Sequence, residues 1–354
     1  MIKTITSFFA AFAFVLVGSA ATQPQSIIFD TDMGNDCDDA IAQVMLFDYV
    51  KQGKAKLLCI ASNKDNPCSP QLISLICQYY GFDDIPIFRV ENGYEHKDGP
   101  FLRRTVEAKN PDGSLKFKLK NPDEKYEESI KGLRKVLAAQ PDNSVVYISI
   151  GFFTNLARLA DSPADDISPL TGAELIAKKV KYVSAMAGGF ATFDIPIWNA
   201  RATHVRPEYN ARIDIPATKR ILENPPCPII LSPFELGMNM RFPYYYVEHG
   251  FYDAPNNPAA YACKVLLQWL FERKKQTAEL DRHIWDLTSV LYVFEPELFT
   301  LSGNGDVEVA RNGTTVFMDS KKGKVRYMIA PEQNWKTILK RCVDLSKTTP
   351  LSVK

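Results

Sequence analysis

The chain has 354 residues, and its 42 basic and 41 acidic side chains give a formal net charge of +1. Hydrophobic residues make up 46% and charged residues 23%, which are ordinary proportions for a globular enzyme. This balance excludes a strongly basic nucleic-acid-binding protein and gives no indication of an acidic partner. The length is compatible with one large α/β domain or with two smaller ones.

The first residues have the pattern of a signal peptide. Lys3 precedes an apolar run at residues 8–17, and the small residues 18–20 follow it, as in an export signal with its cleavage site. The apolar run is too short to span a bilayer. We therefore predict that residues 1–20 are removed and that residues 25–350 form one catalytic domain. The mature protein is expected to be periplasmic or secreted, with no membrane attachment.

An acidic turn between a strand and a helix dominates the N-terminal region. Residues 26–29 are apolar and β-prone, and apolar residues between Ala40 and Val50 recur at helical spacing, which predicts a buried strand and an amphipathic helix. Ligands of open α/β sheets bind beyond the carboxyl ends of strands, where this turn would lie. Its five carboxylates are Asp30, Asp32, Asp36, Asp38 and Asp39.

These carboxylates repel one another unless a positive charge lies among them. No Lys or Arg occurs between Lys3 and Lys51, so a hard divalent cation with oxygen ligands is predicted, either Ca²⁺ or Mg²⁺. The alternative is that Asp36 or Asp38 caps the following helix. A calcium EF-hand loop does not fit, because Ile41 falls where the bidentate Glu belongs.

Apolar runs alternate with helical patterns along the rest of the chain. This alternation predicts an α/β fold with a mostly parallel central sheet flanked by helices. Residues 91–127 are polar and are expected to form a long loop or lid. The predicted strands are residues 55–61, 85–90, 144–150 and 228–232, and a further strand within residues 180–190 ends at a glycine pair. The predicted helices are residues 70–80, 128–139, 258–275 and 334–345. Residues 303–323 are expected to form a hairpin.

The seven cysteines are odd in number and include no CxxC motif. This pattern indicates neither a zinc site nor a disulfide framework. We expect them to be buried as small hydrophobic residues, although export would permit a pair to bridge.

The acidic stretch resembles the N-terminal signature of the inosine-uridine-preferring nucleoside hydrolases, Asp-x-Asp-Pro-Gly-x-Asp-Asp-Ala. Asp30, Asp32, Gly34 and residues 38–40 match it. Met33 replaces the proline, and residues 36–37 look like a two-residue insertion. The insertion leaves open whether Asp36 or Asp38 takes the sugar-binding role of the signature's first paired Asp.

Three later segments match the same family. Ile150 precedes the glycine of a Gly-x-x-Thr-Asn-Leu-Ala turn, Glu208-Tyr209-Asn210 resembles Glu-Phe-Asn, and Asp286 begins the last core helix. The resemblance implies a Rossmann-like fold and calcium-dependent hydrolysis of the N-glycosidic bond of ribonucleosides to free base and sugar. It also implies a homodimer or a homotetramer.

The resemblance further implies the roles of individual residues. Asp32, Asp39, the Ile150 carbonyl and Asp286 would hold Ca²⁺, and Asp32 would act as general base towards a water on the cation. The sugar hydroxyls would be bound by Asp38, Asn66, Glu208 and Asn210, with Asn63 as the competitor of Asn66. Trp285 would contact the substrate in the place of the family's acid histidine. Help for the leaving group would then come from stacking and water, or from His283 or His96.

Two alternatives come from other functional classes. One is a metal-dependent nucleoside- or sugar-binding protein that has lost turnover because the histidine is missing. The other is a Mg²⁺-dependent phosphohydrolase of the haloacid dehalogenase type, which also places Asp-x-Asp after its first strand. That class does not explain Glu208-Tyr209-Asn210 or Trp285-Asp286.

Overall fold

The computed structural model describes residues 23–122, 125–190, 195–197, 200–202, 207–274 and 281–352. The predicted signal peptide falls outside these residues and stays a prediction. Among the described residues, no helix is both long enough and apolar enough to cross a membrane.

The described chain is built around an 11-stranded sheet, most of which is parallel. Its parallel strands lie in the order β15, β9, β6, β5, β1, β2, β3, β4, and three antiparallel strands continue it beyond β15. The parallel strands are β1 (Gln25–Thr31), β2 (Ala55–Lys64), β3 (Ile87–Tyr94), β4 (Glu127–Glu128), β5 (Val145–Ser149), β6 (Val180–Met186), β9 (Ile229–Ser232) and β15 (Val325–Ile329). The antiparallel ones are β12 (Thr300–Leu301), β13 (Gly305–Val309) and β14 (Thr315–Asp319).

Strand β1 lies in the interior of the sheet because both of its faces are apolar. Ile27, Ile28 and Phe29 are completely buried, as expected for a parallel strand covered on both sides. Asp30 pairs in register with Ala61 of β2 and with Ser149 of β5. The ends of these three strands therefore open onto the same edge of the sheet.

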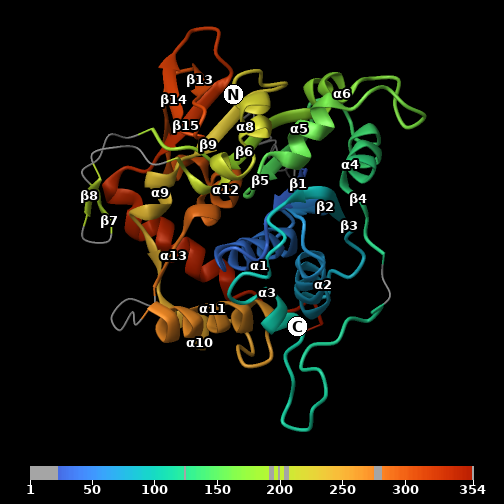
Figure 1. The fold of residues 1–354 in the computed structure, drawn as a ribbon, viewed down its shortest axis with the longest axis vertical. Coiled ribbons are helices and arrows are strands. Elements are labelled where there is room, and N and C mark those ends of the chain that lie inside the picture. Colours follow the sequence, from blue (N-terminus) through green and yellow to red (C-terminus); the bar gives the residue numbers. More distant parts are fainter. Residues whose placement is uncertain are drawn as a thin grey trace, which may run out of the picture.

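Helices cover both faces of the sheet (Figure 1). On one face pack α1 (Asp38–Lys51), α2 (Cys68–Tyr80), α11 (Pro258–Lys274), α12 (Trp285–Phe294) and α13 (Trp335–Ser346). On the other face pack α4 (Ser129–Ala138), α5 (Thr154–Asp161), α6 (Gly172–Lys179) and α8 (Ile215–Leu222). The predicted fold class, a mostly parallel sheet flanked by helices, is confirmed.

Several short elements lie outside the central sheet and its long helices. The short helices are α3 (Leu102–Val106), α7 (Tyr209–Ile213), α9 (Phe234–Met238) and α10 (Tyr244–His249). Strand β10 (Arg241–Phe242) pairs with β11 (Arg282–His283), and β7 (Ile195–Ile197) pairs with β8 (Ala200–Ala202). The β10–β11 pair places Arg282 just before α12.

The structure changes two predictions, adds one strand and confirms the burial of the cysteines. Helix α1 is not amphipathic, because residues 38–47 are all buried between the sheet and neighbouring helices. The predicted loop at residues 91–127 contains the end of β3, helix α3 and the start of β4. Strand β15, which extends the parallel sheet, was not predicted. All seven cysteines are buried, as expected.

Candidate active site

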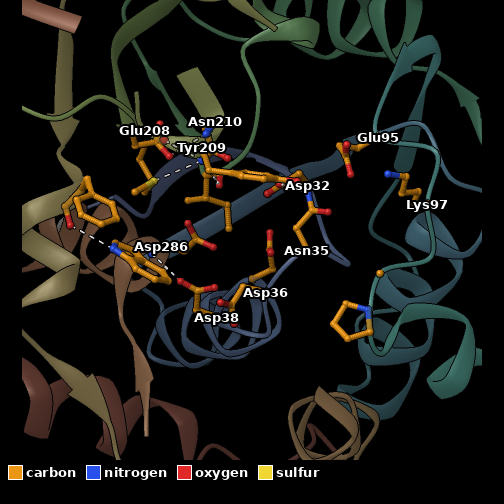
Figure 2. A pocket seen from close by; sticks show the side chains of 17 residues that line it. Asp32, Asn35, Asp36, Asp38, Glu95, Lys97, Glu208, Tyr209, Asn210 and Asp286 are labelled. Carbon is orange, nitrogen blue, oxygen red and sulfur yellow. Dashed lines mark hydrogen bonds between the residues drawn. The ribbon is translucent and has the colours of Figure 1, made fainter. Parts of the chain in front are cut away.

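A cavity of about 410 Å³ opens at the carboxyl ends of β1, β5 and β6. Its size is in the range of small-molecule sites, and its position is the one expected for a ligand site of an open α/β sheet. Figure 2 shows carboxylates from separate elements directed into it. The lining residues are Asp32, Asn35, Asp36, Asp38, Asp39, Glu95, Lys97, Gly99, Pro100, Ile150, Met186, Glu208, Tyr209, Asn210, Phe234, Trp285 and Asp286.

Three buried carboxylates form the centre of the site. Oxygen atoms of Asp38, Asp39 and Asp286 lie within 4.8 Å of one another. Asp38 and Asp39 begin α1, and Asp286 is the second residue of α12, so two helix N-termini converge on the group and favour negative charge there. The Asp286 backbone N–H donates to Asp38 at 3.2 Å, and the Thr31 hydroxyl donates to Asp39.

The electrostatics of this carboxylate group fit a hard divalent cation. Burial raises the pKa of Asp38, Asp39 and Asp286 well above the usual value, and repulsion from the other carboxylates of the acidic turn raises it further. A divalent cation would offset that repulsion, and carboxylate oxygens are the ligands that Ca²⁺ and Mg²⁺ prefer. The residues present therefore suit such an ion.

Asp32 lies in the same cavity, at the end of a short chain of hydrogen bonds. It is 4% exposed, and burial raises its pKa to about 6. The Asn35 amide donates to Asp32, and the Lys64 ammonium donates to the Asn35 carbonyl oxygen at 2.6 Å. Burial lowers the pKa of Lys64, while the nearby Asp32 opposes that shift. Lys64 thus supplies positive charge near Asp32, and the Asn35 side chain lies between the two.

Asp36 differs from the other carboxylates because it is paired. The Arg282 guanidinium forms an ion pair with it, including an Nε to Oδ1 bond at 3.3 Å. This pair ties the inserted residues of the acidic turn to β11, next to α12. Asp36 therefore faces a cation of the protein itself, whereas Asp38 belongs to the three-carboxylate group. The acidic turn has no counter-charge in its local sequence, but Lys64 and Arg282 bring two from distant segments.

Asp30 supports the site from below the cavity. It is completely buried and accepts hydrogen bonds from the Tyr147 hydroxyl at 2.7 Å and the Asn155 and Asn63 amides at 2.9 and 3.0 Å. Burial raises its pKa to about 7 against these hydrogen bonds. Asn155 and Asn63 thus hold the end of β1. The hydroxyl of the neighbouring Thr154 donates to Asp214.

The loop after β5 approaches the acidic turn closely at Gly151. A Cβ atom there would lie 2.6 Å from the Asp32 nitrogen and 2.5 Å from the Asn63 side-chain oxygen. Only glycine permits so close an approach of two backbone segments. The Ile150 carbonyl next to it accepts a hydrogen bond from the Asn210 amide at 3.1 Å.

Glu208 and Asn210 line the cavity from the start of α7. The Glu208 carboxylate accepts from the backbone N–H groups of Asn210, Ala211 and Gly188 at 2.7, 2.9 and 3.2 Å. Burial nevertheless raises the pKa of Glu208 to about 7. The Asn210 amide also donates to the Met186 carbonyl at 3.1 Å. These contacts hold both side chains in place before any ligand binds.

The remaining predicted residues have different positions. Asn66 does not line the cavity; its amide donates to the His96 carbonyl at 2.7 Å and to Asp98 at 3.0 Å. Trp285 lines the cavity, and its indole N–H donates to the Phe234 carbonyl at 3.1 Å. His283 stacks on Trp285 with ring centroids 4.5 Å apart, and His96 is exposed.

Several lining residues were not predicted from the sequence. Tyr209 had the clearest signal, since it stands between Glu208 and Asn210. Asn35 lies inside the acidic turn, but its amide carries no charge to mark it. Glu95 and Lys97 come from the long polar segment. Met186 ends β6 and Phe234 begins α9, and neither apolar residue carries a signal in the sequence.

Comparison with known families identifies the chain. Residues 27–346 match the model of the inosine-uridine preferring nucleoside hydrolase family. This match defines the class of the protein as a hydrolase that acts on N-glycosyl compounds. The chain belongs to the inosine-uridine preferring nucleoside hydrolase family. The phosphohydrolase alternative is accordingly set aside. Comparison with curated protein sequences finds no match.

Solved structures share the fold at low sequence identity. A plant nucleoside hydrolase is 17% identical with a TM-score of 0.68, and the alignment covers 92% of this chain and 99% of that one. A purine-preferring ribonucleoside hydrolase from Gardnerella vaginalis is 13% identical with a TM-score of 0.66, covering 91% and 99%. An inosine-uridine preferring nucleoside hydrolase from Bacillus anthracis is 16% identical with a TM-score of 0.63, covering 91% and 99%.

The raised pKa values predict that stabilisation by a cation depends on pH. Folding raises the pKa of Asp30 and Glu208 to about 7 and that of Asp32 to about 6, whereas carboxyls of an unfolded chain titrate near pH ~4. From about pH 4 to about pH 7 the native protein therefore holds extra protons, and these groups destabilise it as pH rises. A cation requires deprotonated ligands, so the increase in melting temperature caused by Ca²⁺ should grow across this window.

This comparison should be made by thermal unfolding with Ca²⁺ and with EDTA at each pH. Surface carboxylates with lowered pKa values, such as Asp165 beside Arg134, contribute equally to both series and cancel. An increase that is constant with pH, or that shrinks as pH rises, would contradict the interpretation of the carboxylate group.

Replacing Lys64 tests the source of positive charge beside Asp32. Lys64→Met removes a donor from Asn35 and leaves the carboxylates with less compensation, so the metal-free protein should lose about 1–3 kcal/mol of unfolding free energy. Ca²⁺ should reduce this loss, because it replaces part of the missing charge. Denaturant unfolding in EDTA and in Ca²⁺ measures both, with Lys181→Met, at an exposed position of β6, as the matched control. Equal losses in the two conditions would show that Lys64 does not act through the carboxylates.

Proposed function

We propose that the cavity hydrolyses the N-glycosidic bond of ribonucleosides to free base and ribose, with Ca²⁺ as its cation. The observation that carries this proposal is the buried group formed by Asp38, Asp39 and Asp286, which shares one cavity with Asp32. Membership of the nucleoside hydrolase family supports the reaction class. The cavity volume of about 410 Å³ suits a nucleoside-sized ligand.

We propose Asp32, Asp39, the Ile150 carbonyl and Asp286 as the ligands of the cation, with Asp38 beside them. These oxygens come from the turn after β1, from α1, from the end of β5 and from α12. Several protein oxygens on separate elements suit the larger, flexible coordination shell of Ca²⁺ better than the strict octahedron of Mg²⁺. A bound divalent cation supplies Lewis acidity that lowers the pKa of a water molecule.

The protein's own groups then divide the remaining work. Asp32, which the Asn35 amide orients, accepts the proton of the attacking water. Asp38, Glu208 and Asn210 bind the sugar hydroxyls, and the carboxylates around the ring stabilise the positive charge that develops at the anomeric carbon. Because Glu208 and Asn210 are held by backbone contacts, the sugar meets groups that need little reorganisation.

One observation favours a second candidate, a binding protein without turnover. The indole N–H of Trp285 is already bonded to the Phe234 carbonyl, and none of the histidines in the described residues lines the cavity. A leaving base that needs a proton would meet no imidazole donor among these residues. Metal-dependent ribose binding without product would identify this candidate.

Release of ribose tests the proposal. Purified protein with Ca²⁺ should release ribose from at least one ribonucleoside, EDTA should abolish the release, and Asp32→Asn should lower kcat by about 10²–10⁴-fold, as expected for loss of a general base. Asp306→Asn, at an exposed position of β13, is the matched control and should retain full activity. If nucleosides raise the melting temperature but no ribose appears, the binding-protein candidate replaces the hydrolase.

A further inference from the structure

One wall of the cavity is aromatic, and this wall is where the ring of the leaving group would pack. Phe234 and Trp285 stack with ring centroids 5.8 Å apart, and Tyr209 also lines the cavity. The carboxylates, together with Glu208 and Asn210, form the polar part that suits a sugar. A planar ring joined to that sugar would therefore lie against aromatic side chains.

The indole, phenol and ammonium donors of the described cavity are poorly placed to help a leaving group depart. Trp285 donates its N–H to the Phe234 carbonyl at 3.1 Å. Burial of the Tyr209 hydroxyl raises its pKa, and the negative charge of Glu95 raises it further, so this hydroxyl is a weaker acid than a free phenol. Lys97 is exposed and lies on the opposite side of the cavity from Asp286, as Figure 2 shows.

The charge of the cavity favours cations. The lining has more carboxylates than there are positive charges to balance them. The positive charges come from a divalent ion and from the side chains of Lys64, Lys97 and Arg282. A cavity walled by one sign of charge concentrates ligands of the opposite sign, and aromatic rings add cation–π attraction. The seven lining carboxylates are Asp32, Asp36, Asp38, Asp39, Glu95, Glu208 and Asp286.

We propose that this site prefers ribosides whose ring nitrogen is already positively charged, with N-ribosylpyridinium compounds as the simplest class. The inference rests on the proposed function and names its substrate class. Such a ring needs no proton to depart. The water oxygen bonds to the anomeric carbon as the C–N bond breaks, and the electron pair of that bond returns to nitrogen, releasing neutral pyridine. The water proton passes to Asp32 and then to solvent.

The preference is tested by comparing substrates on one Ca²⁺-loaded preparation. Ribose release from N-ribosylpyridinium, uridine and inosine gives three values of kcat/KM, and the cationic substrate should exceed both neutral ones by at least about tenfold, corresponding to about 1.4 kcal/mol. N-ribosylpyridinium 5′-phosphate should be a poorer substrate than the unphosphorylated compound, because its phosphate adds negative charge to a carboxylate-lined cavity.

The outcomes separate this inference from the proposed function. Equal values, or a preference for uridine or inosine, would overturn the inference while leaving the hydrolase in place. No ribose from any substrate would overturn the proposed function itself. A 5′-phosphate that improves kcat/KM would contradict the charge argument.

Two variants test the physical causes separately. Glu95→Gln removes a lining carboxylate and should lower kcat/KM for the pyridinium substrate at least about threefold more than for uridine. Glu91→Gln, which removes a carboxylate that pairs with Arg89 outside the cavity, is the control and should change kcat/KM for neither substrate.

Trp285→His introduces an ionisable donor and should raise the ratio of uridine to pyridinium hydrolysis. A ratio unchanged in both variants would refute the mechanism, and the substrate comparison on the unmodified protein stands if either variant fails to fold.

Discussion

Buried carboxylates repel one another where β1 ends and where α1 and α12 begin. The site depends on this repulsion. Asp38, Asp39 and Asp286 lie in a region almost without solvent, where charges of one sign are expensive to hold together. Two helix N-termini and the cations of Lys64 and Arg282 offset part of that cost. The rest is left for a ligand, which is why the group suits a divalent ion and why the folded protein holds extra protons without one.

The fold creates this repulsion as a consequence of its topology. Parallel strands β1, β5 and β6 end at one edge of the sheet, so the turns after them meet there. Gly151 lets two of those turns come into backbone contact, and Asp30 anchors the end of β1 through Tyr147, Asn155 and Asn63. The carboxylates of the cavity therefore rest on buried strands and helix starts, which hold geometry better than mobile loops.

The sequence was sufficient for the features that are local. Apolar runs predicted most of the parallel strands, and the acidic turn with Asp286 at the start of α12 was visible as a motif. It was insufficient where partners are far apart along the chain. Arg282 pairs with Asp36 across 246 positions, and Lys64 reaches Asn35 from another strand; neither is marked by periodicity or spacing.

Helix α1 was predicted as amphipathic because its burial on all sides depends on α11, α12 and α13, which only the tertiary structure brings together. The same limit applies to Asn66, whose amide bonds to His96 and Asp98 outside the cavity.

Proton release on metal binding tests the central claim most directly. Isothermal titration of Ca²⁺ into the metal-free protein near neutral pH, repeated in buffers of different ionisation enthalpy, counts both the ions bound and the protons released. The account predicts one ion per chain, release of protons from carboxylates whose pKa values burial has raised, and a much weaker affinity for Asp39→Asn. Absence of binding, or binding that releases no protons and is unchanged in that variant, would contradict it.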